Sequence, residues 1–174
     1  MYRIKSVSLC FICFLVFFVM GCSKERAEKV VEIKHYSVDN MDGLIHKTDV
    51  EIDKQISSDG NGSLKITTEK TSVIPLYETG NIDIKHPRLI YQAKVRTEDV
   101  EGPVFIEMWC HFAGQGEFFS RAIQSSLTGS NEWTSQETPF LLDSGQNPDN
   151  VRLNIVINGK GTVWIDDIHL LKSF

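Results

Sequence analysis

Cysteine is scarce in this sequence, and its distribution excludes a disulfide framework in most of the chain. Four cysteines occur among 174 residues, and Cys10, Cys13 and Cys22 lie in the first 22 residues. Cys110 is therefore the one thiol beyond that segment, so no intramolecular disulfide can form there. Because Cys110 lies in an apolar pattern of strand length, we expect it to be a small buried hydrophobic side chain.

Clusters of lysine and arginine are also absent. Residues 1–21 hold two of the 18 basic residues, Arg3 and Lys5, and none of the 23 acidic ones. The rest of the chain therefore carries 16 basic and 23 acidic residues, a formal charge of −7. Such a surface lacks the positive patch that nucleic acid requires, and it offers no electrostatic attachment to anionic lipid.

Motifs of known catalytic sites are missing as well. The sequence contains neither a Gly-x-Ser-x-Gly turn nor a phosphate-binding glycine loop, and its five histidines show no His-x-x-x-His spacing. Two carboxylates, Glu107 and Glu117, could serve a glycosidase, although acidic β-proteins offer such pairs by chance. We therefore expect a protein that is not an enzyme.

Beyond residue 30 no window shows the 3.6-residue apolar period of a helix, and no internal repeat is present. Short apolar or alternating stretches recur instead, separated by turn signals such as Glu101–Pro103 and Gly129–Asn131. The pattern predicts one all-β domain over residues 30–174, a β-sandwich or jelly roll of about ten antiparallel strands, with an up-and-down barrel as the alternative. The expected strands are Val30–Tyr36, Val50–Ile56, Ser63–Thr68, Ser72–Tyr77, Leu89–Thr97, Val104–Phe112, Phe118–Leu127, Trp133–Leu142, Val151–Asn158 and Thr162–Leu171.

The N-terminus is typical of a secretory signal. Arg3 and Lys5 precede an apolar run from Val7 to Met20, which is shorter than the roughly 20 residues that span a bilayer comfortably. The following Val-Met-Gly-Cys resembles the bacterial lipobox, which implies a signal peptide over residues 1–21, cleavage before Cys22 and acylation of its thiol by palmitate-type chains. An uncleaved N-terminal anchor is the alternative.

We expect the charged residues 22–29 to form a tether between the lipid and the domain. Both interpretations place the domain outside the cytoplasm. The lipoprotein interpretation makes it lipid-anchored in the cell envelope, facing the periplasm or the surface. Ser23, in place of aspartate, favours the outer membrane by analogy with Gram-negative sorting.

Four segments carry a resemblance to a known family through their order and spacing along the domain. They are Asp59–Ile66, Leu89–Phe112, Leu127–Thr134 and Gly161–Leu170. The last is the most specific, because aspartates flanked by hydrophobic residues stand in a closing strand. Together the segments resemble the jelly-roll carbohydrate-binding modules of the galactose-binding superfamily, and the resemblance covers residues 30–172. It implies a non-catalytic domain that binds carbohydrate. The alternative is a structural or protein-interaction lipoprotein of the envelope without a sugar site.

Members of that superfamily commonly hold a structural calcium ion, which prefers six to eight oxygen ligands. The resemblance implies a partial cage of Asp166 or Asp167 with backbone oxygens near Gly62 and Ser63 and with Asp53. The alternative is that these aspartates cap turns or pair with lysine and bind no metal.

Strand alternation predicts where a ligand would lie. The apolar sets are expected to face the core, namely Val104, Ile106, Met108, Cys110 and Phe112 in one strand and Val151, Leu153, Ile155 and Ile157 in another. The opposite face then carries Glu107, Trp109, His111, Arg152 and Asn154. An aromatic ring among such groups suits a pyranose, whose apolar face stacks on the ring while its hydroxyls form hydrogen bonds. A face covered by loops is the alternative.

Overall fold

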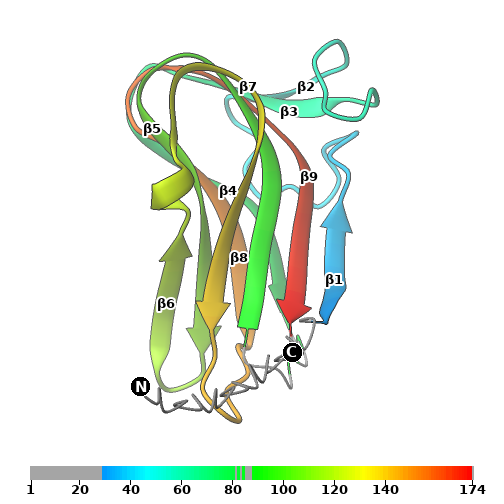
Figure 1. Cartoon of the computed structure of the whole chain (residues 1–174), viewed down its shortest axis with the longest axis vertical. Helices are drawn as coiled ribbons and strands as arrows, with labels where there is room; N and C mark the ends of the chain where they lie inside the picture. The colour runs from blue at the N-terminus through cyan, green and yellow to red at the C-terminus, as the bar shows by residue number, and fades with distance from the viewer. Residues whose placement is uncertain (1–28, 81, 83, 85–87, 174) are drawn as a thin grey trace, which may run out of the picture.

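The structure is a computed structural model that describes residues 29–80, 82, 84 and 88–173 (Figure 1). The predicted signal peptide, Cys22 and the tether up to residue 28 lie outside these residues. In the part of the chain that is described, no helix is both long enough and apolar enough to cross a membrane.

The described residues form nine strands and one short 3-10 turn, Ile123–Ser125, and every strand pair is antiparallel. The strands are β1 Val30–Tyr36, β2 Val50–Asp53, β3 Ser63–Thr68, β4 Ser72–Gly80, β5 Arg88–Phe112, β6 Gly116–Arg121, β7 Leu127–Leu141, β8 Asn150–Ile157 and β9 Gly161–Ser173. The predicted all-β jelly-roll class is confirmed.

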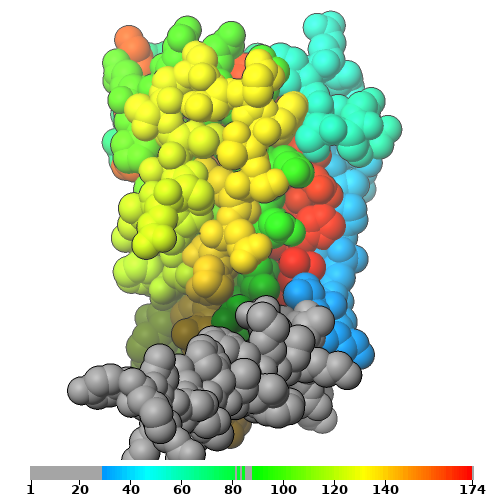
Figure 2. All heavy atoms as spheres, viewed as in Figure 1, coloured from blue at the N-terminus to red at the C-terminus, as the bar shows by residue number. Residues whose placement is uncertain are grey.

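Strand β5 joins two layers of the curled sheet. Its first half pairs with β7 and β9, whereas its second half pairs with β6 and β8. Strand β4 extends the second layer beyond β8, and β1 and β3 flank β9 in the first layer. Figure 1 shows β7, β5, β9 and β1 side by side in that first layer. In the space-filling view, β9 and β1 meet at the surface beside β5, which separates them from β7 (Figure 2).

The sequence predicted two strands, Leu89–Thr97 and Val104–Phe112, where the structure has one bent strand. The predicted turns at Glu101–Pro103 and Gly129–Asn131 are both wrong, because β5 and β7 continue in extended form through them. Gly102 is needed for close packing, since a Cβ there would lie 2.3 Å from the carbonyl oxygen of Asn158. The pairing of β5 with β7 shifts register at this level, which lets the strand pass from one layer to the other.

The core lies between the two layers and follows the predicted alternation. Val104, Ile106, Met108 and Cys110 are fully buried, as are the inward residues of β8. They belong to one cluster with the inward side chains of β3, β9 and the first half of β5. Burial raises the pKa of the Cys110 thiol to about 12, so this residue is the buried hydrophobic side chain that the sequence predicts.

Candidate functional site

The second layer presents an outer face built by β5 and β8. Glu107 lies opposite Asn154 in the strand register, and Trp109 lies opposite Arg152. Because successive side chains alternate and the intervening residues are buried in the core, these four side chains share the outer face. His111 follows on the same face. The structure thus brings together the five residues that the sequence predicted as a ligand-binding set.

Glu107 is the centre of this face, and three side chains donate hydrogen bonds to it. Trp109 Nε1 donates to Oε1 at 2.5 Å, Asn154 Nδ2 donates to Oε1 at 3.0 Å and Arg121 Nε donates to Oε2 at 2.5 Å. Glu107 is only 2 % exposed. Burial alone would raise the pKa of Glu107, but the hydrogen bonds from Trp109, Arg121 and Asn154 together hold it below the ordinary value. The carboxylate is therefore ionised and acts as a fixed acceptor.

An open hollow of about 460 Å³ lies over this face. Its floor and walls come from β4, β5, β6 and β8, together with Ile45 of the loop before β2, which is tied to β4 by a hydrogen bond from its N–H to the Leu76 carbonyl at 2.9 Å. The lining residues are Ile45, Val73, Pro75, Glu78, Glu107, Trp109, Arg121, Arg152, Asn154 and Val156. Its volume falls in the range of small-molecule sites, roughly 300–1,000 Å³.

The Trp109 ring lines one side of the hollow, and Phe119 packs beside that ring. Trp109 is half-buried and lies beside Phe119, with ring centroids 5.0 Å apart and planes tilted by 43°. Phe119 is 50 % exposed, and the guanidinium of Arg121 stands 4.2 Å from its ring centroid. Trp109 lines open space, so the alternative of a face closed over by loops does not hold at this residue.

The polar floor of the hollow includes an unused acceptor. Asn154 is 2 % exposed, and its Oδ1 has no hydrogen-bond partner among the described residues. A buried carbonyl oxygen without a partner is costly, by about 1–3 kcal/mol. Near the rim, Arg152 lies 3.6 Å from Glu117 through Nη2 and Oε1 and remains about one-third exposed. Arg152 is open to a ligand that carries hydroxyl groups, whereas Asn154 Oδ1 is itself covered.

His111 is the one predicted residue that does not line the hollow. Its Nδ1 lies 2.5 Å from Oδ1 of Asp149, and both side chains are 42 % exposed. The backbone of Asp149 also donates to the His111 carbonyl at 3.0 Å. His111 therefore anchors the start of β8 beside the hollow.

Sequence reasoning missed Arg121 and Phe119 of β6 and the side chains of β4. The β5–β6 hairpin register sets Arg121 opposite Glu107 and Phe119 opposite Trp109. Alternation along β6 could have revealed them, because Glu117, Phe119 and Arg121 share one face. The contributions of β4 depend on which strand pairs with β8, and local pattern does not contain that information.

The two carboxylates considered for catalysis lie apart along the sheet. Glu117 pairs with His111, four residues along β5 from Glu107, which corresponds to roughly 13 Å of strand. Glu107 is ionised and accepts three hydrogen bonds, whereas a glycosidase acid must hold a proton. Glu107 and Glu117 therefore have neither the spacing nor the protonation state of a glycosidase carboxylate pair.

Asp166 and Asp167, predicted as calcium ligands, point to different sides of β9. Asp166 Oδ2 accepts from the Ser58 N–H at 2.7 Å, and its Oδ1 accepts from the Asp167 N–H at 2.8 Å. Asp166 is 1 % exposed, and burial raises the pKa of its carboxyl group. Asp167 turns outward, where its Oδ1 lies 2.8 Å from His169 Nε2. The two aspartates do not face one site.

Asp53 and Ser63 stabilise the loop that joins β2 to β3. Asp53 accepts from Trp164 Nε1 at 2.9 Å and from the N–H groups of Gln55 and Ile56, and the bond from Trp164 is the main cause that lowers the pKa of Asp53. Ser63 Oγ donates to the Ile56 carbonyl at 2.6 Å. A calcium ion would have to displace these partners, so these side chains do not form a ready cage. Calcium stays a prediction.

Comparison of the sequence with protein-family models and with curated proteins finds no match. Comparison with solved structures finds several sandwiches of the same architecture. A family 16 carbohydrate-binding module has a TM-score of 0.56 and 14 % identity, and the match covers 75 % of this chain and 91 % of that one. The CBM22-1 xylan-binding domain from Paenibacillus barcinonensis has a TM-score of 0.57 and 11 % identity, covering 82 % and 94 %.

A larger protein gives a similar result. The Clostridium thermocellum xylanase 10B fragment with CBM22-1 and GH10 modules, solved with xylohexaose, matches with a TM-score of 0.60 and 13 % identity. That match covers 81 % of this chain but only 28 % of the xylanase fragment. At such low identity the similarity concerns architecture. The described domain has the β-sandwich fold of carbohydrate-binding modules.

Proposed function

We propose that this protein is a non-catalytic, lipid-anchored envelope protein that binds carbohydrate in the hollow over β5 and β8. The observation that carries the proposal is the placement of Trp109 at the edge of an open hollow whose floor holds Glu107 and Asn154. The ring offers an apolar face for a pyranose, and the floor offers oxygen acceptors for its hydroxyls.

The charge state of the floor supports the same conclusion. Glu107 is ionised and held by three donors, so its carboxylate stays in one position. Asn154 Nδ2 donates one of the hydrogen bonds that fix Glu107, so the floor is rigid before any ligand binds. Arg152 at the rim adds a donor for ring or glycosidic oxygens. Fixed groups of this kind favour affinity because little side-chain freedom is lost on binding.

The fold supports a saccharide as the class of ligand, but it does not specify which saccharide. The similar structures are named as carbohydrate-binding modules, and one is named as a xylan-binding domain. We therefore expect a polysaccharide of pyranose units and include xylan among the first candidates. The predicted acylation of Cys22 would hold this domain at the membrane, where it would retain polysaccharide at the cell envelope.

The test is a screen of the full-length chain against soluble polysaccharides by affinity electrophoresis. The chain should be purified in a polyoxyethylene detergent, because the headgroup of a maltoside detergent is itself a sugar. Retardation by at least one polysaccharide is the expected result. A folded chain that migrates identically in every polysaccharide gel would contradict the proposal.

Protein interaction is the alternative function, and one observation favours it. Phe118, Phe119 and Ile123 are each about half exposed on β6 and the turn that follows it. Exposed apolar groups at one edge are typical of surfaces that contact another protein. Crosslinking in envelope membranes tests this alternative, and a specific adduct lost in Phe118→Ser would support it.

A further inference from the structure

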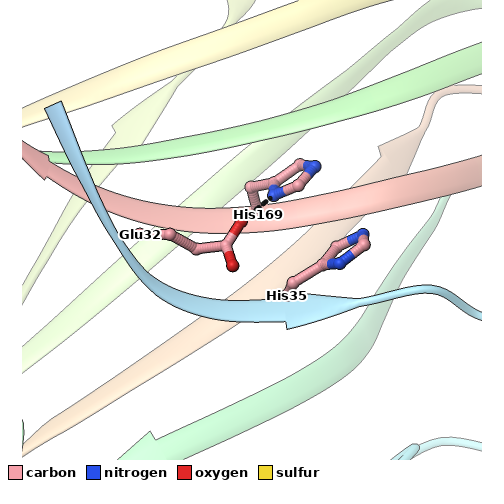
Figure 3. Close-up of side chains that lie close together, drawn as sticks. All are labelled: Glu32, His35 and His169. Carbon is pink, nitrogen blue, oxygen red and sulfur yellow. Dashed lines mark hydrogen bonds and ion pairs between the residues drawn. The ribbon is translucent and has the colours of Figure 1, made fainter.

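Outside the hollow, two imidazoles and two carboxylates meet where β1 pairs with β9. His35 lies directly opposite His169 in the strand register, and their rings stack with centroids 4.2 Å apart and planes 2° from parallel. Figure 3 shows Glu32 and His35 reaching from β1 toward His169 on β9. Asp167 of β9 completes the group, which we call the His35–His169 cluster.

An irregularity in β1 brings Glu32 and His35 to the same side. The pairing with β9 shifts register between Glu32 and Lys34, so the strand holds one extra residue there. Two residues three apart would otherwise face opposite sides. Ile33 and Tyr36 pack against the core instead, which leaves Glu32 and His35 on the outer surface.

A second irregularity, in β9, turns Asp167 and His169 outward together, because the inward positions change from Val163 and Ile165 before it to Ile168 and Leu170 after it. Asp167 has a φ of 49°, and the register with β5 shifts across this position. Asp166 and Ile168 on either side are buried, whereas Asp167 and His169 reach outward. The fold thus departs from regular pairing in two adjacent strands, and both departures direct polar side chains to one place.

The contacts within the cluster need a cation. Asp167 Oδ1 lies 2.8 Å from His169 Nε2 and 3.0 Å from His35 Nε2. The other ring nitrogen of His169, Nδ1, lies 2.8 Å from Glu32 Oε2. A neutral imidazole has one N–H and one bare nitrogen, so it can donate to only one of two carboxylates. The second contact of His169 requires either an extra proton or a metal ion.

We propose that the His35–His169 cluster binds a divalent transition metal ion of the zinc class. Imidazole nitrogens with carboxylate oxygens are the ligands that zinc prefers, whereas calcium takes oxygen ligands almost alone. Ligand atoms of Glu32, His35 and His169 already lie within 4.8 Å of one another. Ligands of a tetrahedral zinc ion are about 3.4 Å apart and the ion lies in the plane of each ligating imidazole, so one of the two stacked rings must turn out of the stack to close the site.

The side chains are free to make that adjustment. His35 and Asp167 are each 41 % exposed, Glu32 is 52 % exposed and His169 is 20 % exposed. A carboxylate that does not ligate the ion directly would accept from the far nitrogen of a ligating histidine and fix its orientation.

The consequence is a metal link between two strands. Among the described strands, β1 pairs with β9 alone, so an ion held by both secures this edge strand. β1 is also the first strand after the predicted tether, and force on the lipid anchor would reach the domain through it. The metal would therefore strengthen the attachment of the anchor to the fold.

The experiment is isothermal titration of zinc chloride into the full-length chain, prepared without a histidine tag and stripped with chelator. One saturable site is expected. His35→Ala and His169→Ala should each weaken the affinity at least tenfold, which is of the order expected for loss of a metal-site partner. His46→Ala, which removes a histidine outside the cluster, should bind as the wild type does.

Thermal melting provides the second readout. Zinc at a hundredfold excess over Kd should raise the Tm of the wild type by about 5–10 °C, and His35→Ala should lose this shift. Calcium at the same concentration should not raise the Tm of the wild type above that of His35→Ala. Because His35 is exposed, its replacement leaves the core intact, which circular dichroism verifies. Absence of saturable zinc binding by the wild type, or zinc affinities of His35→Ala and His169→Ala equal to that of the wild type, would overturn the proposal.

Discussion

Arg121 and Glu107 form an ion pair across β6 and β5, with Nε 2.5 Å from Oε2. The carboxylate side chain is 3 % exposed, whereas the guanidinium is 37 % exposed. The pair thus holds a buried negative charge at the base of the hollow while its positive partner reaches the rim and stacks on Phe119.

Removal of Arg121 should destabilise the domain. Arg121→Ala leaves the Glu107 carboxylate buried with only Trp109 and Asn154 as donors, and we expect a loss of about 1–3 kcal/mol in the free energy of unfolding. Arg152→Ala is the matched control, because its partner Glu117 is exposed, and it should cost less than about 1 kcal/mol. Denaturant unfolding measures both. Equal effects of the two substitutions would contradict the account.

The stability contributed by Glu107 should vanish in acid. Its pKa in the fold lies below the ordinary value of 4.5, so its contribution is fully present above pH 4.5 and declines as the pH falls through the folded-state pKa. The difference in Tm between the wild type and Glu107→Gln should therefore shrink below pH 4.5. Melting curves from pH 7 to pH 3 provide the measurement, and a constant difference would show that the carboxylate is not ionised.

The bend of β5 should depend on the absence of a side chain at Gly102. A Cβ at this position would lie 2.3 Å from the Asn158 carbonyl oxygen, so Gly102→Ala must move backbone and should cost about 1–3 kcal/mol. Gly80→Ala is the control, since its nearest atom, the Asp149 carbonyl oxygen, would be 3.3 Å away. A smaller effect at Gly102 than at Gly80 would argue against the bend.

Calcium binding, which the resemblance implies, has a specific test. If Asp166 contributes to a calcium site, calcium chloride added to metal-free protein should raise the Tm in the wild type and leave Asp166→Asn unchanged. The His35→Ala variant separates this effect from the zinc proposal, because it retains Asp166. If neither calcium nor chelator changes the Tm of the wild type, the predicted calcium site is contradicted.

Acylation of Cys22 can be read by mass spectrometry and by labelling with an alkyne fatty acid. We expect label in the wild type and none in Cys22→Ala, which should also retain its signal peptide. Label in Cys22→Ala would contradict the anchor proposed here.

Much of the fold was accessible from local pattern, because the alternation of buried and exposed residues is short-range information. The boundaries of β1 and β3 match the predicted strands, and the inward residues of the second half of β5 are buried as expected. The continuous strand β5 was missed, because a glycine followed by a proline is typical of a turn. In the structure, Gly102 is instead needed where the backbone packs closely against Asn158. That close packing depends on a partner 56 residues away, beyond the reach of any local window.

The candidate site divides in the same way. Alternation placed Glu107, Trp109, Arg152 and Asn154 on one face, but the hollow also needs Arg121 and side chains of β4, which strand pairing supplies. The His35–His169 cluster escaped the sequence because its histidines are 134 residues apart and show no ligand spacing. Two strand irregularities create it, and register shifts of that kind are set by tertiary packing.

The central claim is that the hollow binds sugar through Trp109. Its most direct test is titration of the full-length chain, in sugar-free detergent, with an oligosaccharide taken from the best polysaccharide of the screen. We predict that Trp109→Ala loses at least about tenfold in affinity, since stacking on an aromatic ring is worth about 1–3 kcal/mol with its buried area. Trp133→Ala removes an indole from β7, outside the hollow, and should bind as the wild type does. Equal affinity of Trp109→Ala and the wild type would contradict the account.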